Sequence, residues 1–172
     1  AHPCDDETKF DQLKERWGVF PLVRLRPEQM IGAILQSTSP STIDQNSHLF
    51  VRTVRFFREN DFVKEYGDLG EDELQDRPGT IPQALLRMNG NLIKELTKSN
   101  PFGTTGRISG LAANDENAVE VAFLVCVTRR PNPEETAVFS EQLKGSRGPQ
   151  REEAVEDLLW SLFNSPEFCW NH

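Results

Sequence analysis

The amino-acid sequence predicts an all-α fold, an irregular bundle of about seven or eight helices. Apolar residues recur at spacings of three and four along most of the 172 residues, which is the period of one helix face. Many of these segments begin at a capping residue or a proline and end at a glycine or a proline. Convincing alternation of apolar and polar residues, joined by hairpin turns, is absent from the sequence, so we expect no sheet.

Two helices are predicted before residue 40. An amphipathic helix within residues 5–17 is indicated by apolar residues at helical spacing, namely Phe10, Leu13 and Trp17. Residues 18–21 interrupt it. The second helix begins at residues 26–28, where Pro27 fits the first turn because its missing N–H has no helical partner there. Its apolar face consists of Met30, Ile31, Ile34 and Leu35, and residues 37–41 end it.

A third helix is predicted over residues 44–62 by an apolar stripe made of Leu49, Phe50, Val54, Phe57 and Val63. Arginines 52, 55 and 58 lie beside this stripe. We interpret them as a solvated or ion-paired face rather than a phosphate site, because an acidic stretch follows directly.

The acidic stretch covers residues 59–79. Between Glu59 and Asp76 it contains eight acids, opposed only by Lys64. It lacks the alternating spacing of oxygen ligands that a calcium loop needs. A polar connection is therefore the better prediction, and a cation site is the alternative.

Two short helices should follow this stretch. The first begins at Thr80, with Pro82 in its first turn, and ends at Asn89-Gly90. The second runs from Asn91 through Leu96 and ends at Asn100-Pro101. Residues 103–107 resemble a phosphate-binding loop only faintly, because they lack the required lysine spacing and a preceding strand, so we predict a plain loop.

The C-terminal third contains the strongest helix signals. Residues 118–127 alternate as a strand would, but Asn114 as a cap, two acids after it and two arginines before Pro131 favour a helix. Asn132-Pro133-Glu134-Glu135 forms a near-complete capping box for a helix to about Lys144, which should bury Ala137, Val138, Phe139 or Leu143. The clearest helix carries Ala154, Val155, Leu158, Leu159, Leu162 and Phe163, and one further turn should hold Phe168 and Trp170.

Composition limits the classes of function. The chain has 19 Lys and Arg against 27 Asp and Glu, so its formal net charge is −8, which disfavours nucleic acid as the main partner. Its longest apolar run, residues 121–127, is much too short to cross a membrane. Eleven Phe and three Trp against one Tyr favour apolar contacts and make a docking surface credible.

The sequence offers little for catalysis. A catalytic histidine would have to be His48, since the other two histidines are at the chain ends. A metal site formed by His2 and His172 is geometrically possible if the ends meet, but chain ends rarely hold ligands in a fixed geometry. Cys126 lies in an apolar run and should be a buried, inert thiol, whereas Cys4 and Cys169 could form a bridge in an oxidising compartment. We therefore assign no catalytic, metal or cofactor-binding residue, and an enzyme is the less favoured reading.

Three segments are similar to a known family. They are residues 82–90, residues 128–135 and, most specifically, the closing residues 157–172, with Leu25–Met30 resembling the start of the family's helix. The sequence resembles the C-terminal domain of unknown function of large planctomycete-type exported proteins, which often also carry a cytochrome c-like domain. Family members commonly have a stretch rich in Cys, Glu and Arg before the segment that matches 82–90, whereas residues 67–77 here contain acids and no cysteine.

The resemblance implies a domain division and a location. Residues 1–24 would form an N-terminal helix and linker, and residues 25–172 a helical module located outside the cytoplasm, in the periplasm or at the cell surface. The leading hypothesis is a non-catalytic scaffold or docking module, with partners among other domains of a longer chain or cell-envelope proteins. The alternatives are an accessory part of a polysaccharide-processing or redox enzyme assembly, and a cation-binding module.

Overall fold

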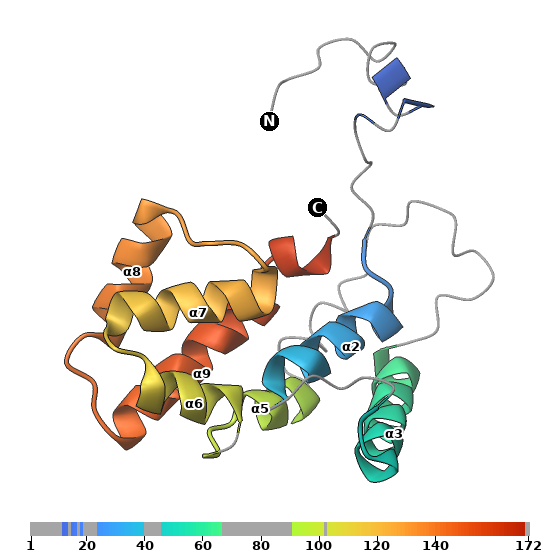
Figure 1. Ribbon diagram of the computed structural model, residues 1–172, viewed down its shortest axis with the longest axis horizontal. Helices are drawn as coiled ribbons and strands as arrows, with labels where there is room; N and C mark the ends of the chain where they lie inside the picture. The colour runs from blue at the N-terminus through green and yellow to red at the C-terminus, as the bar shows by residue number, and fades with distance from the viewer. Residues whose placement is uncertain are drawn as a thin grey trace.

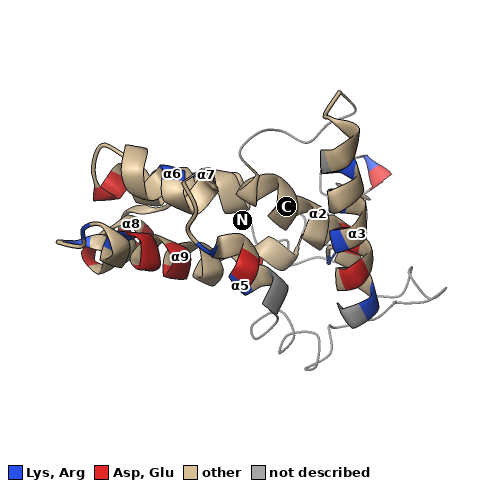
Figure 2. Cartoon of the chain, turned by 90° about the horizontal axis from the view of Figure 1, so that it is seen from below, with Lys and Arg blue, Asp and Glu red and all other residues tan. Residues whose placement is uncertain are grey.

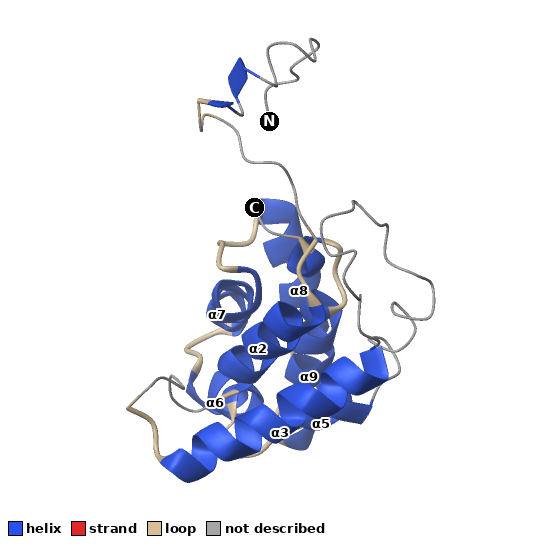
Figure 3. Ribbon diagram, turned by 90° about the vertical axis from the view of Figure 1, so that its right-hand side faces the viewer, coloured by secondary structure: helices blue, strands red, loops and turns tan. Residues whose placement is uncertain are grey.

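The computed structural model describes residues 12–13, 15–16, 18, 24–39, 46–66, 91–101 and 103–170. The side chains of residues 51, 65, 66, 91 and 92 are outside this description. The described helices are α2 (Pro27–Thr38), α3 (Leu49–Tyr66), α5 (Asn91–Thr97), α6 (Thr104–Leu111), α7 (Asp115–Val127), α8 (Pro133–Leu143), α9 (Pro149–Phe163) and the 3-10 turn η2 (Glu167–Cys169). Within this part of the chain the fold is all-α, as predicted, and strands are absent (Figure 3).

The core lies between α9 and the helices that surround it. α9 packs against α5, α6, α7 and α8, and α2 packs against α3, α5, α6 and α7 (Figure 1). The largest fully buried side chains include Met30 and Ile34 of α2, Phe123 of α7, and Leu159 and Phe163 of α9. The apolar faces predicted for the second and last helices are therefore the faces that are buried.

The capping signals near α7 and α8 are confirmed. The Asn114 side chain accepts a hydrogen bond from the Asn117 backbone N–H at 2.7 Å and caps α7. Asn132 and Glu135 form the complete capping box of α8. Because these bonds satisfy N–H groups that have no helical partner, they fix where both helices begin. Of the α8 residues offered as core, Leu143 is buried and Phe139 partly buried, whereas Ala137 and Val138 are exposed.

The plain loop predicted at residues 103–107 is wrong, because these residues lie at the start of helix α6. Two glycines in this segment argue against a helix, but one of them is required by packing. A Cβ at Gly106 would clash with the Asn100 carbonyl oxygen. Gly106 therefore allows α6 to cross directly over the backbone that follows α5.

The predicted bounds of the third helix also need correction. α3 begins at Leu49, after non-helical residues 46–48, and extends to Tyr66 rather than ending at Phe62. The first part of the acidic stretch, predicted as a connection, is thus helical up to residue 66. The helices predicted at residues 80–89 and, for the most part, 5–17 fall outside the described residues.

α3 lies at the edge of the bundle, with α2 as its main packing partner (Figures 1 and 3). Phe62 is its buried aromatic side chain, with an exposed fraction of 4%. The opposite side of α3 carries Leu49, Phe50, Val54, Phe56 and Phe57, which are exposed by 72%, 69%, 38%, 60% and 61%, respectively. We call these five residues the α3 face.

Candidate functional site

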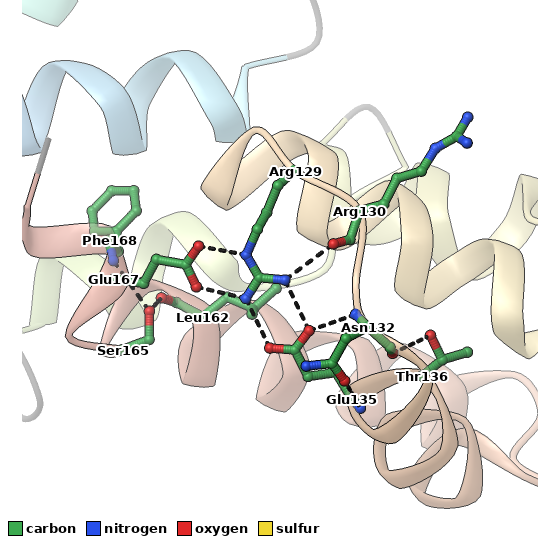
Figure 4. A network of polar contacts seen from close by, with 9 residues as sticks. All are labelled: Arg129, Arg130, Asn132, Glu135, Thr136, Leu162, Ser165, Glu167 and Phe168. Carbon is green, nitrogen blue, oxygen red and sulfur yellow. Dashed lines mark hydrogen bonds and ion pairs between the residues drawn. The ribbon is translucent and has the colours of Figure 1, made fainter. Parts of the chain in front are cut away.

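Arg129 lies at the centre of a polar network that joins three elements (Figure 4). Its guanidinium donates to Glu167 of η2 through Nε at 2.5 Å and Nη2 at 2.6 Å. On the other side it donates to Glu135 of α8 through Nη1 and Nη2, both at 2.8 Å. Two bidentate pairs on one guanidinium fix its plane and both carboxylates.

Local backbone geometry places Arg129 in this position. α7 ends at Val127 and is followed by Thr128, whose φ of 58° is left-handed and turns the chain out of the helix. Left-handed geometry costs energy in a β-branched residue, and Thr128 adopts it although its side chain is exposed. The turn lays the guanidinium 5.3 Å from the centre of the Phe123 ring, where cation and aromatic face attract each other.

The network favours the ionised form of Glu135. Hydrogen bonding from Arg129 lowers the pKa of Glu135, with a smaller opposing effect of burial. The same carboxylates raise the pKa of Arg129 above its already high usual value. A general acid needs a raised carboxyl pKa, whereas the pKa of Glu135 is lowered. This arrangement therefore suits a structural role, which is to hold α7, α8 and η2 together, rather than proton transfer.

The network also lies beside a contact between the residues just before α2 and the residues at the end of η2. The Leu25 N–H donates to the Cys169 carbonyl oxygen at 2.8 Å, and Arg24 and Trp170 form an isolated antiparallel bridge. Glu167 is only two residues from this contact. Arg129 thus holds η2 in place, and Leu25, just before the start of α2, is hydrogen-bonded to η2.

The described residues considered for catalysis, His48 and Cys126, are in positions that indicate structural roles. His48 is exposed, and its Nδ1 accepts a hydrogen bond from the Phe50 N–H at 3.2 Å, so it caps α3. Cys126 is buried, as predicted, and burial raises the pKa of its thiol well above the usual range. A thiol with such a pKa is a poor nucleophile near neutral pH. His2 and His172 lie outside the described residues, so the optional terminal metal site is untested. The buried Cys169 thiol donates to the Ser165 carbonyl oxygen at 3.3 Å, so the structure does not form the bridge to Cys4 that the sequence left open.

The hydroxyl groups of the faint phosphate-like segment, residues 103–107, are used in hydrogen bonds within the protein. The Thr104 hydroxyl donates to the Ser37 carbonyl oxygen and the Thr105 hydroxyl to the Thr97 carbonyl oxygen, both at 2.6 Å. These bonds tie α6 to α2 and α5. No group of three or more His, Cys, Asp or Glu suited to a metal occurs in the part of the chain that the structure describes. None of the described helices is long and apolar enough to span a membrane.

Two grooves lie beside α2. The larger, about 570 Å³, lies among α2, α6 and α7 and is lined in part by Ile108, Leu111, Val121 and Val125. The smaller, about 360 Å³, lies among α2, α3 and α5. Phe50 and Val54 of the α3 face form part of its wall, opposite Leu96 and Glu95 of α5. The α3 face thus continues into a concave surface.

The sequence predicted a docking surface from its many phenylalanines but did not locate it. Spacing along α3 identifies an apolar stripe without telling which side meets the core. The sequence did contain a signal for the exposed surface, because the helix has two apolar sides. One side carries Phe62, and the other carries Phe50 and Phe57. Comparisons with family models, curated proteins and solved structures gave no match.

Proposed function

We propose that this protein is a non-catalytic helical docking module, and that the α3 face is where a partner protein binds. The observation that carries the proposal is the exposure of three phenylalanines and a leucine on one side of a single helix. Contiguous exposed apolar side chains of this size are unusual on a monomer's surface and typically mark an interaction site. α3 packs against α2 and its Phe62 is buried, so the helix is held in the bundle while its other side is exposed.

The resemblance to the C-terminal domain of large exported proteins gives the setting of this proposal. Two of the segments that carry it, residues 128–135 and 157–172, contribute Arg129, Glu135 and Glu167 to one network. The contact between the two segments supports treating them as one structural unit. The partners would then be other domains of a longer exported chain or proteins of the cell envelope.

Site-specific photocrosslinking tests the proposal in the cells that make the protein. Benzoylphenylalanine would replace Phe57 in one variant and Val138 of α8 in a control, because their exposed fractions are similar, 61% and 57%. We expect a defined adduct from position 57 that position 138 does not give. Identical adduct patterns at both positions, or none at position 57, would overturn the proposal.

A further inference from the structure

The α3 face is bordered by arginines on both edges. Arg52 precedes Phe56 by four residues, and Arg58 follows Val54 by four residues, so each arginine is a neighbour of one edge of the face. Residues 49–58 contain three arginines and no acid, although the whole chain has a net charge of −8. Figure 2 shows basic residues on α3. This short surface therefore has the opposite charge to the protein as a whole.

Two of these arginines have no carboxylate partner in the described part of the chain. Arg55 pairs with Glu59, with 2.6 Å between Nε and Oε1, and this pair lies on the half-buried side of α3. Arg52 is exposed and Arg58 half-buried, and neither forms an ion pair with any described residue. Their charges are available to a partner.

The shape beside the face favours a helix over a flat surface. Phe50, Val54 and Arg58 of α3 line the groove between α3 and α5, and Leu35 of α2 also lines it. Polar residues such as Thr38, Ser39 and Asn100 also line the groove, so its lining is mixed. A concave surface of this kind accepts an amphipathic helix whose apolar side lies against Phe50 and Val54. Glu95 stands on the α5 wall, so acidic side chains of a partner are favoured on the α3 side only.

We propose that the α3 face and its groove bind an acidic amphipathic α-helix of a partner protein. Its apolar stripe packs on Phe50, Val54 and Phe57, and carboxylates beside the stripe pair with Arg52 and Arg58. The face runs over nine residues of α3, roughly 12 Å at 1.5 Å per residue, so two to three turns of the partner suffice. This inference rests on the proposed docking function and specifies the chemistry of its partner.

The test uses two fluorescein-labelled 14-residue helical peptides with identical leucine positions. One carries glutamates beside the leucine stripe, and the other carries lysines at the same positions. Binding to the full chain is measured by fluorescence anisotropy. Because the protein is acidic overall, non-specific attraction favours the lysine peptide. We expect at least tenfold tighter binding of the glutamate peptide, a preference that only a local basic site explains.

Variants locate the site. Arg52→Glu should weaken binding of the glutamate peptide at least fivefold, and Arg58→Gln should weaken it in the same direction. Arg147→Glu is the matched control, because Arg147 is exposed and lies in the connection before α9. Circular dichroism and the unfolding midpoint confirm that each variant is folded. Equal affinity for both peptides, or equal losses from Arg52→Glu and Arg147→Glu, would overturn the inference.

Other occupants of the face give distinct results. Sedimentation with phosphatidylglycerol vesicles, without binding of the glutamate peptide, would assign the face to a lipid surface. Concentration-dependent dimerisation abolished by Phe57→Ser would assign it to a second copy. Tighter peptide binding after Glu71, Asp72 and Glu73 are changed to Gln would assign it to the chain's own acidic stretch. Each of these results would overturn the inference. If the crosslinked adduct at position 57 still formed in the Arg52→Glu variant, the docking function would stand, but the preference for an acidic partner would be ruled out.

Discussion

Arg129 and Glu167 are 38 residues apart in the sequence and form a bidentate ion pair, with 2.5 Å between Nε and Oε1 and 2.6 Å between Nη2 and Oε2. The same guanidinium holds Glu135, so one residue joins the end of α7, the start of α8 and the final turn η2. Arg129 is partly shielded, with 36% of its side chain exposed.

Replacing Arg129 should therefore destabilise the protein. Arg129→Met leaves two carboxylates close together without their cation, and we expect a loss of about 1–3 kcal/mol in the free energy of unfolding. Urea unfolding followed by circular dichroism measures it. Arg130→Met is the control, because Arg130 is 79% exposed in its pair with Glu120 and should change stability by less than about 0.5 kcal/mol. Similar losses for both variants would contradict a special role of the network.

The same network predicts a dependence of stability on pH. The folded-state pKa of Glu135 is lowered, so its contribution is complete above the unfolded-state pKa of about 4.3 and is lost as pH falls through the lower folded value. Glu135→Gln retains an oxygen for the capping box and removes the charge. The wild type should be more stable than this variant at pH 7, and the difference should shrink by pH 3. A difference that stays constant between these pH values would rule out this linkage.

Two glycines of α6 should respond in opposite directions to the same substitution. Gly106→Ala places a methyl group against the Asn100 backbone, and we expect a loss of about 2 kcal/mol or more. Gly110→Ala meets nothing within 4 Å and should gain up to about 1 kcal/mol from helix propensity. Thermal unfolding of both variants compares them directly. A neutral Gly106→Ala would show that α6 does not cross the Asn100 backbone as closely as the structure has it.

Two phenylalanines of α3 separate folding from surface function. Phe62 is 4% exposed, and Phe62→Ala should cost about 3–5 kcal/mol because it empties a packed site. Phe57 is 61% exposed, and Phe57→Ala should cost less than about 1 kcal/mol. Guanidinium unfolding gives both values. If Phe57→Ala were as damaging as Phe62→Ala, the α3 face would belong to the core and could not be a docking surface.

Local patterns predicted most of the described fold. Capping residues and period were sufficient for α7, α8 and α9, because Asn114 and Asn132 act on N–H groups within three residues of themselves. α6 was missed because Gly106 weakens the local helix signal, and the reason for this glycine, its close approach to the Asn100 backbone, is a packing contact that no local pattern reveals. Four of the five residues of the α3 face, all except Phe56, were predicted as an apolar stripe. Their exposure was not predicted, since exposure depends on which neighbours pack against the helix. The Arg129 network joins residues 38 positions apart, and sequence spacing carries no signal for such a contact.

The bridge between Arg24 and Trp170 and the bond from Leu25 to Cys169 have a mechanical consequence. They lie beside η2 and just before α2, a helix about 18 Å long against which α3 packs. Tension applied at residues 24 and 170 would load this bridge and η2 first. The Arg129 network would resist it, and a partner bound at the proposed α3 face would be held away from the loaded contact.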